Sequence, residues 1–541
     1  MVPRKGLPIL RRFRNNESAL GQFPSIRSSQ TFARSAAVYG SAFLAALGVL
    51  TLLHYPLLRL PYFWDEAGYY IPAALDFYHH GLLIPQRTMP TGHTPLLSVY
   101  LGLAWRLFGF SPLVTRVAMI AVAAGTLAAL YALGRTVARR ETAAWACVLL
   151  ALSPVFFAQS SLAHLDLPAA FTTTAGVYFL LRRRFAWFAL LLSLAVLTKE
   201  TAVVFLPVAW LYAWRLRKEL KPSAAVWLAL PLLPLAAWAL DYHHSTGFWT
   251  GNPAYLKYNL YSTLEPARIL VTLLRRLYQV FFAGFNWLLL AAAILGYQAM
   301  KRVSITGAAL ENFPSVEISH SRARQDFLFL AAGLTVAYVG MLSAVGGAVL
   351  PRYLLPIFPC FYLALILFVD CLPRPAMRGV LLLAAACFIA SWFINPPYPF
   401  PYEDNLAYRD FIRLHQQAAD FLSNQPDAPR ILTAWPATDE LDEPALGYVK
   451  RPLRVVHLKG FTARNFGTIS SNSFDLLYLY SRKWDPPDNW LRRSLWAEAA
   501  LEFAPPVPAA RLEQTYHLKL LASFQRRGQW VKIYSRRPAG R

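Results

Sequence analysis

The chain has 541 residues, of which 56% are hydrophobic and only 15% are charged, and its mean hydropathy is +0.35. Soluble proteins carry about 25% charged residues, so this composition excludes an ordinary soluble protein and predicts a polytopic membrane protein. The net charge of +24 does not indicate a nucleic-acid partner, because the basic residues lie in short clusters between apolar runs, as in cytoplasmic loops. The cysteines imply no disulfide framework, since all lie in or beside apolar runs: Cys147, Cys360, Cys371 and Cys387.

The first segment, residues 1–35, is polar and basic, and we expect a disordered cytoplasmic tail. Its basic residues are Arg4, Lys5, Arg11, Arg12, Arg14, Arg27 and Arg34. The apolar run at 36–58 is too long for the core of a signal peptide and lacks a convincing cleavage site. We therefore expect an uncleaved first span that leaves the chain on the external face.

A large external loop is expected at 59–116. It contains one short apolar run at 96–108, which Arg106 interrupts. Thirteen residues cannot cross a hydrocarbon core of about 30 Å, so this run predicts a helix on the membrane surface.

The remaining apolar runs predict ten further spans. Basic clusters fall alternately between them, which predicts about eleven spans with the N-terminus inside and the C-terminus outside. A second external loop is expected at 241–282, and its stretch at 268–281 has an amphipathic pattern. The expected spans are 117–133, 142–157, a fourth ending near 182, a hairpin of 185–197 and 203–214, then 226–240, 284–299, 327–344, 353–369 and 380–393.

The composition changes at Pro396, and residues 396–541 predict a small extracytoplasmic α/β domain. This segment is large enough to bury its own core. Helical periodicity covers 408–424. Strands are predicted at 430–435, 453–458, 474–480, 518–524 and 529–534. Residues 36–395 then form the transmembrane domain.

Several polar residues are expected to meet on the external face. The first are the adjacent acids Asp65 and Glu66, which follow Phe63 and Trp64 at the end of the first span. Two carboxylates beside a membrane carry a desolvation cost, which favours a functional reason for their position. The others are His93, His164, Asp166, Lys199, Glu200, Arg352 and Tyr353.

Each of these residues also has a purely structural interpretation. The acid pair suits a solvated loop start with interfacial aromatic residues, and His93 suits a turn before Pro95. Asp166 is a plausible helix N-cap before Pro168. The cations Lys199 and Arg352 are both suitable as interfacial anchors.

Acids and bases on one membrane face suit the transfer of a group from a phosphate to a hydroxyl. Asp65 could take the hydroxyl proton of an acceptor. Lys199 and Arg352 could offset the charge of a phosphate leaving group, and the substrate carrying that phosphate would be a lipid. A divalent cation such as Mg²⁺ or Mn²⁺ is also possible at Asp65, Glu66 and Asp166, although the two cations could make it unnecessary.

Five sequence motifs occur in a recognisable order over residues 36–395. They are WDEAGYY, HTPLLSVYLGLAWRLFG, SLAHLDLPAAF, LAVLTKETAVVFLP and PRYLLPIFP. This ordered set resembles the GT-C superfamily of membrane glycosyltransferases, closest to the branch of protein O-mannosyltransferases and lipid A aminoarabinose transferases. The set differs from many relatives in having Thr94, rather than proline, after His93, which weakens the case for His93 as a phosphate contact.

The resemblance implies an integral-membrane enzyme that uses a polyprenyl-phosphate sugar. It implies Asp65 as the catalytic acid/base, with Glu66 in the same motif and Asp166 supporting the second external loop. Substrate binding is expected at His93, His164, Lys199, Glu200, Arg352 and Tyr353.

The predicted function is the inverting transfer of a monosaccharide from this lipid donor to a hydroxyl of a protein, lipid or cell-surface glycan. We expect the chain in the inner (plasma) membrane, with its C-terminal domain in the periplasm. A transporter or lipid flippase is the main alternative, but such proteins place ionisable residues near the middle of spans, and these spans have almost none. A scaffold that presents the outer domain is the third possibility.

Overall fold

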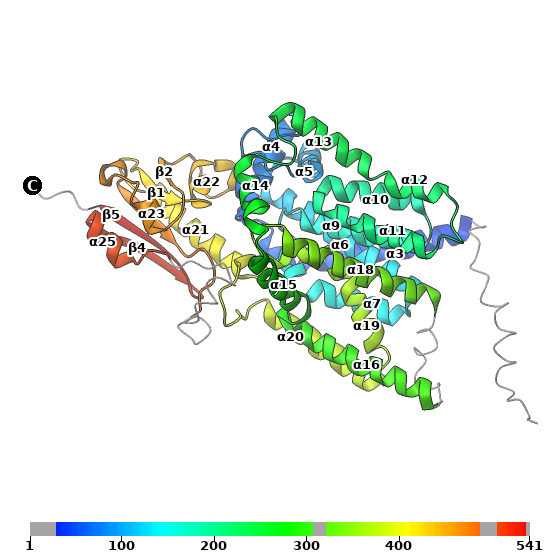
Figure 1. Cartoon of the computed structure of the whole chain (residues 1–541). Helices are drawn as coiled ribbons and strands as arrows, with labels where there is room; N and C mark the ends of the chain where they lie inside the picture. The colour runs from blue at the N-terminus through cyan, green and yellow to red at the C-terminus, as the bar shows by residue number, and fades with distance from the viewer. Residues whose placement is uncertain (1–28, 307–320, 487–505, 537–541) are drawn as a thin grey trace, which may run out of the picture.

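The computed structural model describes residues 29–306, 321–486 and 506–536. A long bundle of helices carries a small α/β domain at one end (Figure 1). The predicted fold class, a mostly helical polytopic membrane protein with a small C-terminal α/β domain, is confirmed.

Six helical segments of the described residues are long and apolar enough to cross a membrane. They are Ala37–Leu57, Pro112–Val137, Ser223–Thr246, Pro266–Arg302, Arg322–Ala344 and Arg374–Ser391. Three shorter apolar helices accompany them, Leu96–Phe108, Phe185–Thr198 and Phe358–Val369. The predicted count of eleven spans is not confirmed.

The helices of the bundle follow one another with short connections. Their bounds are α3 (Ser29–His54), α4 (Ile71–His80), α5 (Leu96–Phe108), α6 (Pro112–Val137), α7 (Arg140–Leu152), α8 (Pro154–Gln159), α9 (Asp166–Leu181), α10 (Phe185–Thr198), α11 (Phe205–Arg215), α12 (Ser223–Ala229), α13 (Leu232–Thr246), α14 (Pro253–Asn259), α15 (Pro266–Phe281), α16 (Asn286–Thr306), α18 (Arg322–Ala344), α19 (Phe358–Val369) and α20 (Arg374–Ser391). The short helices that matter for the site are η2 (Glu66–Tyr70), η3 (Glu200–Val204), η7 (Pro351–Leu354) and η8 (Tyr402–Asp404).

Several boundaries differ from the sequence predictions. The second span begins at Pro112 rather than 117, because the Ser111 side chain accepts a hydrogen bond from Val114 N at 3.3 Å and Pro112 fits the first helical turn. The third and seventh spans are divided before Pro154 and Pro231, residues that lack the N–H needed inside a helix. Helix α3 begins at Ser29, so the expected tail is helical from there on; Arg4 to Arg27 lie outside the described residues.

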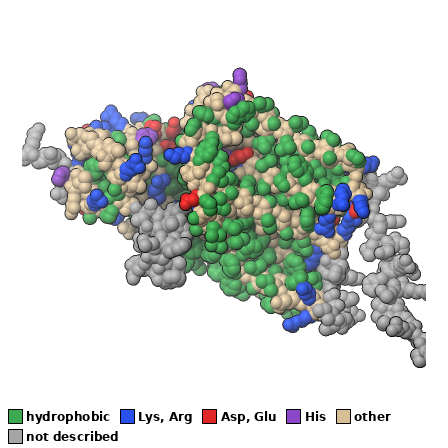
Figure 2. Space-filling model, viewed as in Figure 1, with side chains coloured by type: hydrophobic (Ala, Val, Ile, Leu, Met, Phe, Trp, Pro, Cys, Tyr) green, Lys and Arg blue, Asp and Glu red, His purple; other side chains and the backbone are tan. Residues whose placement is uncertain are grey.

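Basic side chains gather at the end of the bundle opposite the α/β domain, and a wide hydrophobic surface separates the two ends (Figure 2). Arg183 donates to Glu219 at 2.7 Å, and Arg322 pairs with the same carboxylate, so three loops far apart in sequence meet at this end. This distribution agrees with loops held on the cytoplasmic side.

The C-terminal domain contains a five-stranded sheet of order β2-β1-β3-β5-β4. The strands are β1 (Ile431–Ala434), β2 (Val455–Leu458), β3 (Leu476–Tyr480), β4 (Leu518–Arg526) and β5 (Gln529–Arg536). Strands β2, β1 and β3 are parallel, whereas β5 and β4 continue the sheet antiparallel. The amphipathic helix α21 (Ala407–Ser423) packs against β4 and β5. All five strands lie where the alternation of apolar residues predicted them.

The α/β domain rests on the loop that follows α3. Tyr62 N donates to Leu446 O at 3.2 Å, and the Tyr448 hydroxyl donates to Tyr62 O at 3.0 Å. The ring of Phe63 meets that of Phe411 edge to face at a centroid distance of 5.3 Å. These contacts hold the α/β domain over the loop that follows the first span and carries Asp65 and Glu66.

Candidate active site

The acid pair lies at a sharp turn. Trp64 has a left-handed backbone with φ 47°, which is costly for a bulky residue and is enriched at functional sites. The π-helical turn η2 follows directly, and such turns are also common at functional sites. The two carboxylates leave this turn in different directions and meet different surroundings.

Arg352 is the centre of a buried charge cluster. It donates to three carboxylates: Asp65 through Nη2, Asp166 through Nη1 at 3.1 Å, and Glu403 through Nε at 3.0 Å. Lys199 Nζ donates to the other oxygen of Asp166 at 2.5 Å. Two cations thus serve three carboxylates, which leaves one negative charge when all five groups are ionised.

Asp65 is the member of this cluster that reaches open space. Its side chain is 18% exposed, whereas Asp166 and Arg352 are each 1% exposed. Arg352 holds Oδ2 of Asp65, and among the described residues no group donates to Oδ1. One oxygen is therefore anchored and the other is available to a substrate.

Glu66 has a different position. It is fully buried, and it pairs with Arg116, whose Nη2 donates to Oε2 at 3.0 Å. The backbone N–H groups of Phe63 and Ala163 also donate to it, at 2.8 and 2.5 Å. Both oxygens are occupied, so the geometry favours a role in fixing the turn. The catalytic role of Glu66 stays a prediction.

Lys199 and Arg352 are also buried, with 7% and 1% exposure. Lys199 Nζ lies 4.0 Å from the centre of the Tyr353 ring. Neither cation lines the cavity described below, and each is held by carboxylates. A phosphate could reach them only by displacing those carboxylates, so the geometry favours a role in positioning Asp65 and Asp166.

The two predicted histidines lie in separate places. His164 is buried, and its Nδ1 lies 2.6 Å from Gln159 Oε1 and 3.9 Å from Glu403 Oε2. His93 is partly exposed; its Nδ1 lies 3.1 Å from Glu200 Oε2, and the Tyr255 hydroxyl lies 3.1 Å from its Nε2. Of the pair, only His93 lines the cavity.

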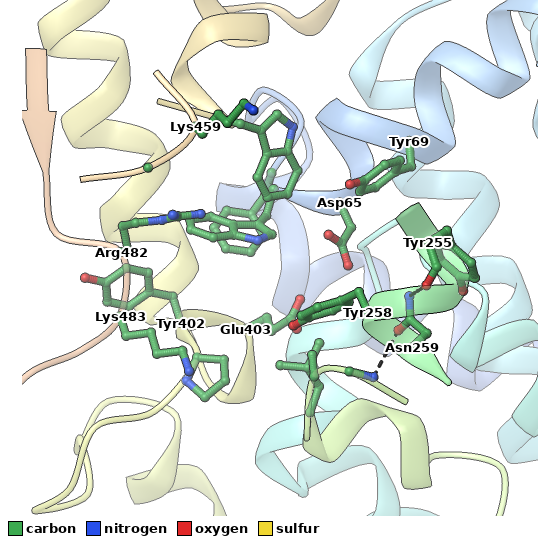
Figure 3. Close-up of a pocket in the computed structure, with 18 of the residues that line it drawn as sticks. Asp65, Tyr69, Tyr255, Tyr258, Asn259, Tyr402, Glu403, Lys459, Arg482 and Lys483 are labelled. Carbon is green, nitrogen blue, oxygen red and sulfur yellow. Dashed lines mark hydrogen bonds between the residues drawn. The ribbon is translucent and has the colours of Figure 1, made fainter. Parts of the chain in front are cut away.

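A cavity of about 940 Å³ lies between the helical bundle and the α/β domain. Figure 3 shows Asp65 pointing into it, with Tyr69, Tyr255 and Tyr258 on the bundle side and Arg482 and Lys483 on the other. Trp64, Tyr69 and Trp435 line the cavity together with Asp65. The ring centroids of Trp64 and Tyr69 lie 5.4 and 5.7 Å from the ring centroid of Trp435. Faces of aromatic rings beside polar groups suit a sugar, which has apolar C–H faces and polar edges.

Burial changes the acidity of the third acid in the cluster. It raises the pKa of Glu403 to about 7, and the neighbouring charges of Asp65 and Asp166 act in the same direction, whereas Arg352 opposes them. A neutral Glu403 removes the excess negative charge of the cluster and leaves Arg352 for the two aspartates.

Sequence reasoning missed Arg116, Glu403, Trp435, Lys459 and Arg482. A signal for Glu403 was present: Pro399 to Asp404 read PFPYED after the last span, as Pro61 to Glu66 read PYFWDE after the first. Proline, aromatic residues and an acid pair thus occur twice, at the two ends of the transmembrane domain, and the two segments meet at Arg352.

The possible divalent-cation site at Asp65, Glu66 and Asp166 does not form as one cluster. Glu66 pairs with Arg116, while the two aspartates share Arg352. No group of three or more His, Cys, Asp or Glu side chains in the described ranges has an arrangement suited to a metal ion.

Residues 92–240 match a protein-family model described as dolichyl-phosphate-mannose-protein mannosyltransferase. The structure is similar to that of ArnT from Cupriavidus metallidurans in the apo state, with a TM-score of 0.54 and 13% identity over 92% of this chain and 98% of that chain. The chain therefore has an ArnT-like fold and contains a segment that matches this mannosyltransferase family model. No curated protein gives a significant match.

Two further solved structures are less similar to this chain. ArnT bound to undecaprenyl phosphate gives a TM-score of 0.49, with 12% identity over 94% of this chain and 98% of that chain. The Archaeoglobus fulgidus oligosaccharyltransferase in complex with Zn and sulfate gives 0.45, with 13% identity over 81% of this chain and 67% of that chain.

Proposed function

We propose that this protein is a GT-C glycosyltransferase, which transfers a monosaccharide from a polyprenyl-phosphate donor to a hydroxyl acceptor at the external face of the inner membrane, with inversion at the anomeric carbon. The observation that carries the proposal is Asp65, which has one oxygen anchored by Arg352 and the other facing the cavity. The description of the matched family names a lipid-phosphate sugar, dolichyl-phosphate-mannose, as the donor, and this supports a donor of the same class.

Helix α15 is the element that we propose binds the donor. Leu270, Leu274 and Tyr278 repeat every four residues and are 58%, 59% and 42% exposed, which suits contact with lipid tails. Arg268 and Arg275 lie on the same helix and line the cavity. A lipid chain could therefore remain in the bilayer while its phosphate enters the cavity beside these two cations.

Asp65 is proposed to accept the proton of the acceptor hydroxyl as the new glycosidic bond forms. The bond between the anomeric carbon and the phosphate oxygen breaks in the same step, and the lipid phosphate leaves with that electron pair. A single displacement with base and leaving group on opposite sides of the sugar inverts the anomeric configuration. The ion-pair network around Arg352 keeps the carboxylate in place without reorganisation.

The other predicted site residues would bind the donor or support the residues around Asp65. His93, held between Glu200 and Tyr255, and Tyr353 would contact the donor from the bundle side, since His93 and Tyr353 line the cavity. Asp166, Lys199 and His164 would support Arg352 and Glu403 from behind. Transport of a lipid or solute, the alternative, has no specific observation in its favour here.

The test is Asp65→Asn, which keeps the shape of the side chain and removes its basicity. Turnover with a polyprenyl-phosphate sugar should fall by about 10² or more, the usual scale for losing acid–base help, while donor binding persists. Asp420→Asn is the matched control, because Asp420 is exposed on α21. Near wild-type transfer by Asp65→Asn, or a product with retained configuration by NMR, would contradict the mechanism.

A further inference from the structure

The three parallel strands of the α/β domain all end at the cavity. Strand β1 ends at Ala434 and is followed by Trp435, β2 ends at Leu458 and is followed by Lys459, and β3 ends at Tyr480 shortly before Arg482. Trp435, Lys459 and Arg482 all line the cavity. The carboxyl edge of this parallel sheet therefore forms the cavity wall that faces Asp65 (Figure 3).

The strand order makes this edge a favourable place for a ligand. In the order β2-β1-β3, the strand that follows β1 in the chain, β2, pairs with one edge of β1. The next strand, β3, pairs with the opposite edge. Open α/β sheets bind ligands in the crevice at such a reversal, outside the carboxyl ends of the strands. Here the crevice opens into the same space as Asp65.

The positive charge of this edge indicates the class of ligand that it would bind. Lys459 and Arg482 are both exposed, and neither forms an ion pair with a carboxylate in the described parts of the chain. The guanidinium of Arg482 lies 5.6 Å from the centre of the Trp64 ring, directly beside the residue that precedes Asp65. A guanidinium over an aromatic ring and an ammonium on the same wall of the cavity suit a phosphate or carboxylate.

We infer that the α/β domain binds an anionic group, a phosphate or carboxylate, of the acceptor through Lys459 and Arg482. This inference rests on the proposed function and adds the substrate class: the acceptor hydroxyl belongs to a molecule that also carries a negative charge. The donor phosphate is assigned to the other side of the cavity, where α15 presents its apolar face to lipid and its arginines to the cavity. Asp65 lines the same cavity.

The first measurement uses inorganic phosphate as the probe and needs no turnover. With excess polyprenyl phosphate present to fill the proposed donor site, line broadening of the ³¹P signal of inorganic phosphate should show binding to the purified full-length protein. Lys459→Ala/Arg482→Ala should weaken this binding about tenfold or more, as expected for lost bonds to charged groups. Lys450→Ala/Arg451→Ala is the control, because it removes the same charge from exposed positions of the same domain that do not line the cavity.

The second measurement separates the acceptor from the donor. With acceptor extracted from cells that lack the enzyme, Lys459→Ala/Arg482→Ala should raise the KM for the acceptor about tenfold and leave the KM for the donor unchanged. An increase in the donor KM instead would overturn the inference, because the anion would then be the donor phosphate. Phosphate binding equal to wild type, or an uncharged acceptor identified by mass spectrometry, would overturn it as well.

These outcomes are distinct from a failure of the proposed function. If Asp65→Asn remains fully active, the mechanism fails whatever the phosphate measurement gives. If Asp65→Asn is inactive while the cationic pair has no effect on either KM, the proposed function stands and only the anionic subsite is wrong.

Discussion

At the residue scale, the site depends on how one arginine is shared. Arg352 forms ion pairs with three carboxylates. Its positive charge is therefore shared, and Asp65 interacts with it less strongly than it would in an isolated ion pair. Burial of an unbalanced charge is costly, so the raised pKa of Glu403 is the natural response of the cluster. Protonation of Glu403 balances the charges, with two cations facing two anions.

This balance predicts a pH dependence of stability. Glu403 has an ordinary pKa of 4.5 and a pKa of about 7 in the folded protein, so folding favours its protonated form. Its stabilising contribution is full below about pH 4.5, falls as the pH rises toward 7, and is absent above. Glu403→Gln stays neutral, so the apparent Tm of the wild type should fall relative to this variant by a few °C between about pH 5 and 8.

Thermal unfolding followed by tryptophan fluorescence at several pH values would check this. Glu443→Gln, at an exposed position in the same domain, should follow the wild type at every pH. Parallel curves for Glu403→Gln and the wild type would show that Glu403 is ionised throughout this range.

At the scale of elements, the turn η2 and the loop after β1 fit closely together. A Cβ on Gly68 would lie 2.5 Å from Nε1 of Trp435, so the ring of Trp435 sits directly on the backbone of η2. This contact joins the α/β domain to the turn that carries Asp65. It explains why a glycine stands three residues after the catalytic candidate.

Gly68→Ala should therefore displace Trp435 and open the wall of the cavity. We expect a loss of stability of about 1–3 kcal/mol, typical of overpacking, and slower transfer. Gly40→Ala is the control, because nothing lies within 4 Å of a Cβ at that position. The combined Gly68→Ala/Trp435→Ala should recover much of the lost stability relative to the sum of the two single changes, as a double-mutant cycle would measure. Additive effects would contradict the contact.

At the scale of the whole molecule, the cavity requires the loop after α3 and the α/β domain to lie on one side of the membrane. The basic loops at the other end of the bundle favour the cytoplasm for that end (Figure 2), and we therefore predict that the cavity lies outside.

Labelling of single cysteines would test this topology in a variant without the native four, none of which forms a disulfide. His80→Cys and Asn424→Cys, both at exposed positions near the cavity end, should react with a membrane-impermeant reagent in intact cells. Arg217→Cys, exposed in a basic loop at the opposite end, should react only after permeabilisation. The reverse pattern at either of the first two positions would place the site inside the cell.

The sequence by itself determined the fold class, most of the helices and all five strands. These features depend on local patterns, namely apolar runs, the alternation of apolar residues in strands and the break in composition at Pro396. The sequence also pointed to Asp65, because an acid pair beside a membrane stands out without knowledge of its partners. Helix ends were less well predicted where the signals were single residues, as at Ser111 and Pro112.

Only the tertiary structure decided where each candidate site residue lies and which groups it contacts. Asp65 and Glu66 are neighbours in sequence, yet one faces the cavity with Arg352, 287 residues away, and the other is buried with Arg116. The wall formed by Trp435, Lys459 and Arg482 depends on strand order, and no local pattern reports which strand ends will face a distant loop. A charged residue acquires its role from partners that folding brings to it, and for this reason its own neighbours in the chain could not reveal that role.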